Sequence, residues 1–159
     1  MNRGTGQSAR DIPGPEAENM AWERANGSAF QGLLGYRLAL WEPDCAVIEY
    51  DVDAGHLNRS GVLHGGVLVT LLDTAAGYAG CHCALPGRIR RTLTLSLTTN
   101  FVAPVTAGRL CVEGRRTGGG RRIFFAAAEA RDDAGRLLAG AVGTFRYIGE
   151  SGDLAGMPR

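Results

Sequence analysis

The sequence contains no lysine: all 17 basic residues are arginines. With 16 acidic residues, the net charge is +1. The absence of lysine excludes Schiff-base catalysis, because that chemistry needs a primary amine on the protein. The near-neutral charge gives no general electrostatic footprint for nucleic acid, so we expect no nucleic-acid partner. We attribute the arginine bias itself to genomic base composition.

Long apolar runs are also missing. No segment approaches the roughly 18 uninterrupted apolar residues that span a bilayer, so we expect no membrane partner. The N-terminus lacks the apolar core of a signal peptide. The four cysteines (Cys45, Cys81, Cys83 and Cys111) are therefore expected as free thiols in a reducing compartment, and the protein as cytoplasmic.

The 159 residues suffice for one domain with a hydrophobic core. We expect residues 1–15 to be a disordered tail, 16–148 to form the single domain, and 149–159 to be a loose C-terminal tail. Periodicity predicts helices over 16–26 and 64–81, and strands over 36–41, 46–53, 91–102, 109–116, 121–131 and 137–147.

Turn signals lie between the last strands, at Gly118-Gly119-Gly120 and at residues 132–135, and predict antiparallel hairpins. The helix over 64–81 is apolar around almost its whole circumference, which is typical of a buried helix. The predicted fold class is therefore α+β, with an antiparallel sheet wrapped around one long central helix.

The most informative segment joins a polar loop to that helix. Gly65 and Gly66 lie at the helix start, where backbone N–H groups are free and a ligand can approach closely. Asp73 is the one carboxylate in the helix, and burying it is costly unless it has a partner or a task. The segment predicts an oxyanion-binding helix end together with a buried acid or base.

The spacing of these two groups indicates a dimer. Eight residues separate Gly65 from Asp73, which is about 12 Å along a helix. One chain therefore cannot easily place both groups on one carbonyl. Two chains with antiparallel helices can, and a two-fold dimer then holds two equal composite sites.

The pattern Asn58-x5-His64-Gly65-Gly66-x6-Asp73 resembles that of the hotdog-fold acyl-CoA thioesterases of the phenylacetate-pathway (PaaI-like) group. The resemblance covers residues 30–147. Weaker support comes from residues 100–104, from Gly120-Arg121-Arg122-Ile123-Phe124-Phe125, and from the strand that contains Thr144. The resemblance implies the hotdog fold, composite sites in a homodimer, and a dimer of dimers.

The same resemblance implies roles for individual residues. The Gly65 N–H, with Gly66 beside it, should polarise the thioester carbonyl, and Asn58 should orient that carbonyl or the water. Asp73 should be the general base or the nucleophile, and Thr94 should hold the water. No metal and no cofactor is implied, apart from the coenzyme A of the substrate.

Each of these residues also has a purely structural interpretation. Asp73 can cap the backbone of a neighbouring chain, and Asn58 can simply terminate a turn. His64 is a candidate catalytic histidine, but we favour a role in fixing the loop through backbone hydrogen bonds. The glycine pair can serve close packing of helix and sheet.

Seven arginines gather near the predicted strand ends and form a candidate surface for the phosphates of coenzyme A: Arg88, Arg90, Arg91, Arg115, Arg116, Arg121 and Arg122. Arg90, Arg91, Arg121 and Arg122 can bind the phosphates of coenzyme A, or they can be solvated edges. Cys81-His82-Cys83 lacks a credible fourth ligand, so we predict no metal site. No helix pattern follows Gly118–Gly120, which favours a hairpin turn over a phosphate-binding loop.

We therefore predict an acyl-CoA thioesterase that hydrolyses an acyl- or aryl-CoA to the free acid and coenzyme A. A hotdog hydratase or dehydratase is one alternative, although such sites usually pair a histidine with an acid. A non-catalytic acyl-CoA sensor is the other, although it would usually lack the carboxylate. Small residues (Ala75, Ala76 and Gly77) suggest room for a ring or a medium chain.

Overall fold

The structure is a computed structural model that describes residues 15–159. The N-terminal tail expected over 1–15 lies outside these residues except for its last position. The helices are α1 (Pro15–Ala25), α2 (Ala29–Leu34), the short 3-10 turn η1 (Ala54–His56) and α3 (Gly65–Cys81). The strands are β1 (Arg37–Glu42), β2 (Cys45–Asp51), β3 (Arg88–Ile89), β4 (Thr92–Phe101), β5 (Arg109–Gly119), β6 (Ile123–Asp132), β7 (Leu137–Tyr147) and β8 (Met157–Pro158).

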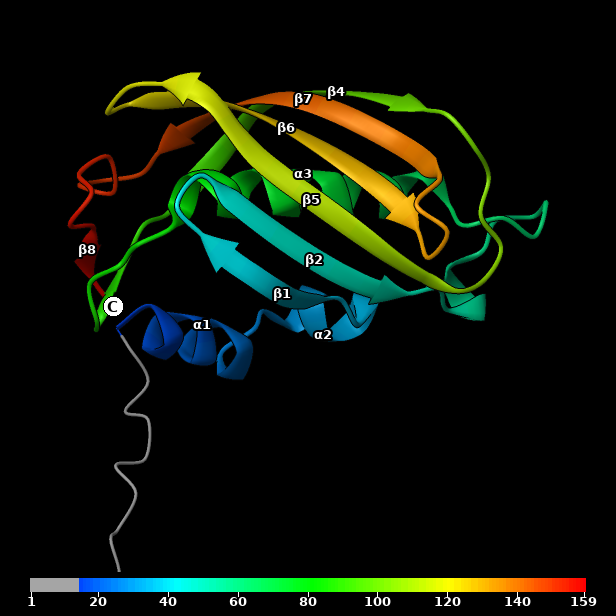
Figure 1. Cartoon of the computed structure of the whole chain (residues 1–159), viewed down its shortest axis with the longest axis horizontal. Helices are drawn as coiled ribbons and strands as arrows, with labels where there is room; N and C mark the ends of the chain where they lie inside the picture. The colour runs from blue at the N-terminus through cyan, green and yellow to red at the C-terminus, as the bar shows by residue number, and fades with distance from the viewer. Residues whose placement is uncertain (1–14) are drawn as a thin grey trace, which may run out of the picture.

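Six strands form one antiparallel sheet in the order β1-β2-β5-β6-β7-β4. Figure 1 shows this sheet curving over α3, with α1 and α2 lying below β1. The predicted architecture, an antiparallel sheet around one central helix, is confirmed. The hairpin turns are confirmed as well: the Gly120 N–H donates to the carbonyl of Ile123, and the Gly135 N–H to that of Asp132.

The helix lies close to the sheet because the facing residues are small. On β5, a Cβ atom on Gly114 would lie 2.2 Å from the Ala75 carbonyl oxygen of α3. On α3, Ala75 and Ala76 are themselves buried in the core, so they do not provide the room for substrate that the sequence suggested. Phe124 and Phe145 stack at 5.0 Å between ring centres and fill the space near the C-terminal end of α3.

One side of α3 is not covered by the sheet. Asp73, Thr74, Gly77 and Tyr78 are only partly buried, whereas the opposite side of the helix is in the core. The adjacent strand β4 is an edge of the sheet, and nearly all of its residues are at least partly exposed. The open side of the helix and the free strand edge therefore lie next to each other.

The C-terminal segment differs from the expected loose tail. β8 pairs with β3, and Ser151 is fully buried, its hydroxyl accepting a hydrogen bond from the Arg91 N–H at 2.9 Å. Arg88 donates to the carbonyls of Ala155 and Gly156. These contacts join segments about 60 residues apart in the chain. A local periodicity in the sequence therefore does not predict them.

Candidate active site

The start of α3 presents one free backbone donor. His64 is the N-cap, and its Nδ1 accepts the Gly66 N–H at 2.9 Å. The His64 carbonyl accepts the Val67 N–H at 2.9 Å. Within residues 15–159 the Gly65 N–H has no acceptor, so it is available to a ligand, as its predicted role requires.

These contacts argue against the predicted role of Gly66 and favour one of the two interpretations of His64. The Gly66 N–H is already bound to His64, so Gly66 does not offer a donor to substrate. His64 acts as a helix cap, which is the loop-fixing role that we favoured over catalysis.

Asn58 holds the loop that precedes the helix. Its Oδ1 accepts the N–H of Ser60 at 2.9 Å and that of Val62 at 3.4 Å. Leu57 and Leu63 form an isolated bridge that closes the same loop. The Asn58 side chain therefore terminates a turn, and only its amide nitrogen remains for a carbonyl or a water.

Asp73 and Thr94 meet between α3 and β4. The Thr94 hydroxyl donates to Asp73 Oδ1 at 2.8 Å. Partial burial raises the pKa of the Asp73 carboxyl above its ordinary value, and the hydrogen bond from Thr94 opposes that rise. The carboxylate is thus a stronger base than an exposed aspartate, and its second oxygen is free to take a proton.

A hollow of about 390 Å³ opens beside Asp73 along the uncovered side of α3. Gly77 and Cys81 of α3 line it, and so does Trp41 of β1, whose indole N–H donates to the Tyr78 carbonyl at 2.8 Å. Glu23 and Tyr78 also line it, joined by a hydrogen bond of 3.1 Å from the tyrosine hydroxyl. No local sequence pattern predicts this pair, because the two residues are 55 positions apart.

Gly65 and Asp73 do not meet within one chain. Both belong to α3, and eight residues of helix hold them about 12 Å apart along its axis. Within one chain, the free Gly65 N–H and the Asp73 carboxylate therefore cannot both contact the same carbonyl group.

The four predicted coenzyme A arginines divide into distinct environments. Arg90 donates to the carbonyls of Ser151 and His82 and stacks over the Tyr147 ring at 4.5 Å, so it mainly holds the chain together. Arg91 lines the hollow beside Asp73. Arg121 and Arg122 lie at the β5–β6 turn, both exposed, and Arg121 pairs with Asp153 at 3.3 Å.

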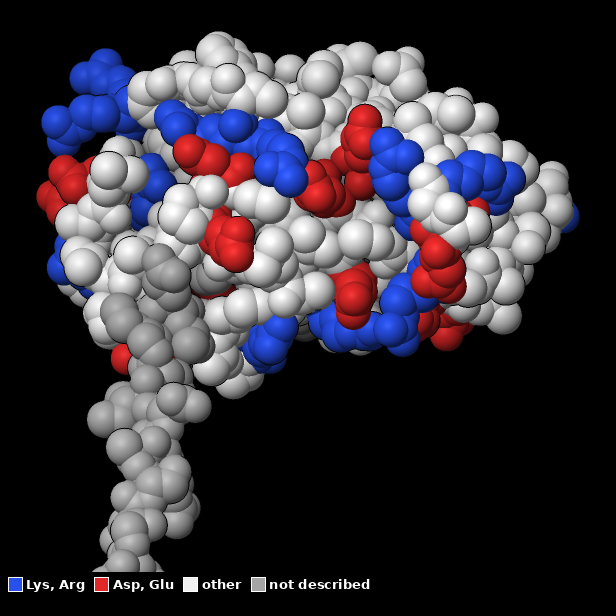
Figure 2. Space-filling view, viewed as in Figure 1, with Lys and Arg blue, Asp and Glu red and all other residues white. Residues whose placement is uncertain are grey.

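Charge is mixed elsewhere on the surface. Figure 2 shows positive and negative side chains interspersed on the face that it presents. Among the described residues, no group of three or more His, Cys, Asp or Glu side chains is placed to hold a metal. No helix in the described part of the chain is long and apolar enough to cross a membrane.

Known proteins are similar to this chain in sequence and in fold. The family model described as "Thioesterase superfamily" matches residues 60–139, which include Gly65, Asp73 and Thr94 but not Asn58. A Saccharolobus solfataricus protein named "Putative esterase" is 33% identical over 113 residues, covering 71% of this chain and 73% of that protein.

Solved structures agree. The E. coli PaaI protein from the phenylacetic acid degradation operon superposes with a TM-score of 0.72 at 25% identity, covering 84% of this chain and 96% of that one. A thioesterase from Haemophilus influenzae gives a TM-score of 0.71 over 80% of this chain and 87% of that one; at 24% identity this likeness shows the shared fold.

Proposed function

This chain belongs to the thioesterase superfamily, and on that premise we propose that it hydrolyses acyl- or aryl-CoA thioesters at a site shared between two subunits. Asp73 of one subunit acts as general base or nucleophile, and Gly65 of the partner subunit polarises the carbonyl. The observation that carries the proposal is the pair of complementary half-sites on α3: a free Gly65 N–H and a desolvated Asp73 held by Thr94.

The exposed surfaces support a two-fold dimer. An edge strand presents unpaired backbone N–H and C=O groups that can bind a strand of another chain. On the edge strand β4, Leu93 and Leu95 are 48% and 52% exposed. Pairing of β4 with its copy would continue the sheet and bring the two open sides of α3 together in antiparallel fashion. Asp73 of each subunit would then face Gly65 of the partner subunit.

The chemistry follows from these positions. Water attacks the thioester carbonyl carbon while its proton passes to the free oxygen of Asp73. The negative charge that forms on the carbonyl oxygen is stabilised by the Gly65 N–H and by the positive end of the helix dipole. The carbon–sulfur bond then breaks, and the thiolate of coenzyme A takes the proton. In the nucleophilic alternative, Asp73 attacks the same carbon and the carbon–sulfur bond breaks, which releases the thiolate of coenzyme A and leaves an anhydride. Water then hydrolyses the anhydride to the free acid and Asp73, and the thiolate takes the proton that this step supplies.

The hollow beside Asp73 receives the acyl group in this proposal. Gly77 lines this hollow and has no side chain to fill it. A Cβ atom added at Gly77 would have its nearest neighbour 3.8 Å away, so there is space beside the helix. The coenzyme A phosphates are assigned to the exposed arginines of the β5–β6 turn, Arg121 and Arg122. One guanidinium group can donate two parallel hydrogen bonds to the oxygens of one phosphate. No resident cofactor takes part in any of these steps.

The Asp73→Asn variant tests the proposal. Asparagine keeps the size of the side chain and an oxygen to accept the Thr94 hydrogen bond, but it is neither a base nor a nucleophile. We expect kcat for thiol release from acyl-CoA to fall by at least about 100-fold, the lower range for loss of a general base, with little change in KM. Glu129→Gln, on the exposed outer face of β6, is the matched control. Turnover of Asp73→Asn near that of the control would remove Asp73 from the mechanism.

A further inference from the structure

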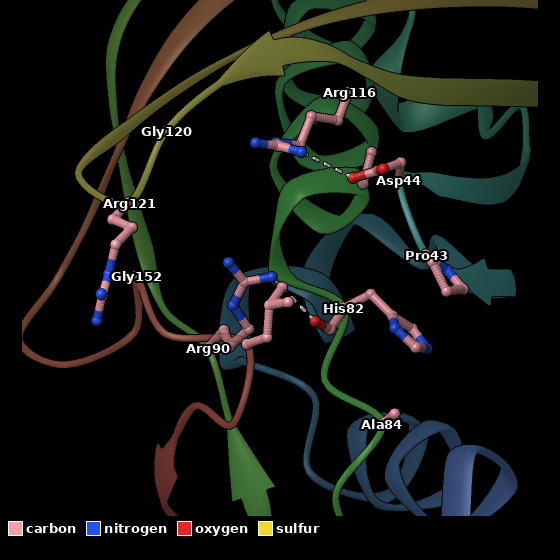
Figure 3. A pocket seen from close by; sticks show the side chains of 11 residues that line it. Pro43, Asp44, His82, Ala84, Arg90, Arg116, Gly120, Arg121 and Gly152 are labelled. Carbon is pink, nitrogen blue, oxygen red and sulfur yellow. Dashed lines mark hydrogen bonds and ion pairs between the residues drawn. The ribbon is translucent and has the colours of Figure 1, made fainter.

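A second hollow, of about 600 Å³, lies beyond the C-terminal end of α3. Its walls come from the β1–β2 turn with Asp44, the β5–β6 turn with Arg121, and the segment after α3 with Arg90 (Figure 3). Arg116 of β5 completes the lining. The hollow is separate from the one beside Asp73, although Arg90 contributes to both.

Arg116 is out of pattern for its strand. β5 alternates, so Val112, Gly114 and Arg116 share the face that packs on α3, while Arg115 points to the outer face. Val112 is fully buried, and Gly114 lies against the helix backbone. Because α3 ends at Cys81, the Arg116 side chain projects into the hollow rather than onto the helix.

The Arg116 guanidinium has an unmet donor. Its Nη1 donates to Asp44 Oδ1 at 3.3 Å, but its Nε is buried and has no hydrogen-bond partner within residues 15–159. A buried donor without an acceptor costs free energy that an arriving acceptor would return. An anion that enters the hollow and replaces Asp44 as the partner of Nη1 would let the guanidinium turn, so that Nε could donate to it as well.

The charge of the hollow calls for an anion. Arg90, Arg116 and Arg121 line the hollow with one carboxylate, that of Asp44, whose side chain is 62% exposed, and Arg121 also pairs with Asp153 at 3.3 Å outside the lining. Arg90 is fixed by its carbonyl bonds and by Tyr147, and Arg121 stands at the open side with an 83% exposed side chain. Two guanidinium groups held by contacts within the fold thus surround the space together with an exposed one, which would exchange its ion pair with Asp153 for a bound anion.

The negative end of the α3 dipole does not cancel this charge. The Gly80 carbonyl accepts the Tyr147 hydroxyl at 2.8 Å, and the Tyr78 carbonyl accepts the Trp41 indole N–H at the same distance. The His82 carbonyl accepts Arg90. Because these terminal carbonyls are occupied by donors, the helix end repels an anion less than a bare one would.

A purely structural role for the Arg116 side chain explains less. Arg116 already holds the β1–β2 turn through its backbone, whose N–H donates to the Asp44 carbonyl at 3.0 Å. The side-chain ion pair with Asp44 is open to solvent on the Asp44 side, which is 62% exposed against 25% for Arg116, and such accessible pairs contribute little to stability. Neither contact provides an acceptor for Nε.

We propose that this hollow binds a phosphate monoester, with Arg116 and Arg121 donating to its oxygens and Arg90 adding fixed positive charge. A phosphate monoester has three terminal oxygens and a charge of about −2, so it can accept from two guanidinium groups at once, whereas a carboxylate has two oxygens and a single charge. Two sources fit the same chemistry: the 3′-phosphate of coenzyme A, or a separate molecule that carries a phosphate monoester. The phosphate site stands on the hollow alone, and only its assignment to coenzyme A rests on the proposed function.

Binding measurements test the site without turnover. Coenzyme A, dephospho-coenzyme A (which lacks the 3′-phosphate) and adenosine 5′-monophosphate are titrated calorimetrically into the full chain at low salt. Arg116→Gln removes the charge and the buried Nε donor, and Arg115→Gln is the matched control on the outer face of the same strand. Asp44→Asn removes the competing carboxylate and does not depend on the stability of the Arg116 variant.

If the site takes the 3′-phosphate, Arg116→Gln weakens coenzyme A binding by about tenfold or more, as expected for a lost hydrogen bond to a charged group. Dephospho-coenzyme A binding then stays unchanged, and Asp44→Asn tightens coenzyme A binding. If Arg116→Gln weakens adenosine 5′-monophosphate but leaves coenzyme A unchanged, the site takes a separate phosphate monoester.

Equal affinities of Arg116→Gln and Arg115→Gln for all three probes, with no tightening by Asp44→Asn, would overturn the phosphate site. That result would leave the hydrolytic proposal intact, since it rests on Asp73. Loss of activity is not part of this experiment, so failure of the two proposals can be told apart.

Discussion

The close approach of α3 to β5 makes Gly114 a sensitive position for both stability and catalysis. A Cβ atom there would lie 2.2 Å from the Ala75 oxygen, 2.3 Å from the Ala75 carbonyl carbon and 2.7 Å from the Ala76 nitrogen. All three are backbone atoms of the helix that carries Asp73, so no side-chain rotation relieves the clash. To reach van der Waals contact in Gly114→Ala, the helix must retreat by about 1 Å.

Two effects of that displacement can be estimated. Overpacking of this kind costs about 1–3 kcal/mol, which for a chain of this size lowers Tm by roughly 2–4 °C per kcal/mol. A shift of about 1 Å in a catalytic group costs on the order of 100-fold in rate. Asp73 lies two residues before Ala75, so we expect kcat to fall by a factor of that order while the fold persists.

The assays are thermal unfolding and the release of free thiol from an acyl-CoA. Gly118→Ala is the matched control, because Gly118 lies on the same strand and an added Cβ there meets nothing within 4 Å. We expect Gly118→Ala to behave as the unaltered protein within about 0.5 kcal/mol. If Gly114→Ala and Gly118→Ala have the same Tm and the same kcat, the close contact that positions Asp73 is not as described.

Two further predictions concern the base and the substrate. Thr94→Val removes the hydrogen bond that lowers the pKa of Asp73, so that pKa should rise. Because the base works deprotonated, the acid limb of the kcat/KM profile should move to higher pH. An acid limb that stays in place or moves to lower pH would contradict the Thr94–Asp73 contact. Arg121→Gln with Arg122→Gln should raise KM for acyl-CoA but not for the same acyl group on N-acetylcysteamine. Raising salt from about 50 to about 500 mM shortens the Debye length from roughly 14 to 4 Å and should weaken only the acyl-CoA; an equal salt response of both substrates would show that these arginines are merely solvated.

The regular elements of the fold could be predicted because their patterns are local. β7 was predicted over 137–147 and occupies Leu137–Tyr147, and α3 begins one residue after the predicted start. Small elements were missed: α2 has six residues, with Ser28 as its N-cap and Gly35 as its C-cap, and β3 and β8 have two each. Such short elements are held by tertiary contacts rather than by sequence periodicity.

Strand β4 shows where alternation alone is insufficient. Its threonines and leucines alternate, yet Leu93 and Leu95 face outward and are about half exposed, while Thr94 pairs with the buried Phe145 and faces α3. Thr94, which donates a hydrogen bond to Asp73, therefore takes the position facing the helix. A pattern read for burial cannot reveal this orientation, because it depends on the partner across the sheet.

The site was predictable where chemistry is carried by spacing along one helix, as for Gly65 and Asp73. It was not predictable where long-range packing decides. Arg90 is committed to carbonyls at His82 and Ser151, Arg116 turns inward at the end of α3, and Glu23 reaches Tyr78 across 55 positions. None of these arrangements follows from local composition.

The central claim is that each active site takes Asp73 from one subunit and the Gly65 N–H from the other. Gly65→Pro deletes that N–H, and proline suits the first position of a helix because His64 before it is already extended, at φ −61° and ψ 133°. The added Cβ would lie 3.2 Å from the ring of Phe101, which is 57% exposed and can shift to accommodate it. The most direct measurement mixes inactive Gly65→Pro chains with inactive Asp73→Asn chains and follows thiol release after subunit exchange.

A mixed dimer contains one site with both wild-type groups and one site with neither. We predict that activity reappears as mixed dimers form, up to about half of the wild-type value per mixed dimer, since one of two equal sites is restored. No recovery in mixed dimers that are shown to form and to be folded would contradict the shared site and place catalysis within a single chain.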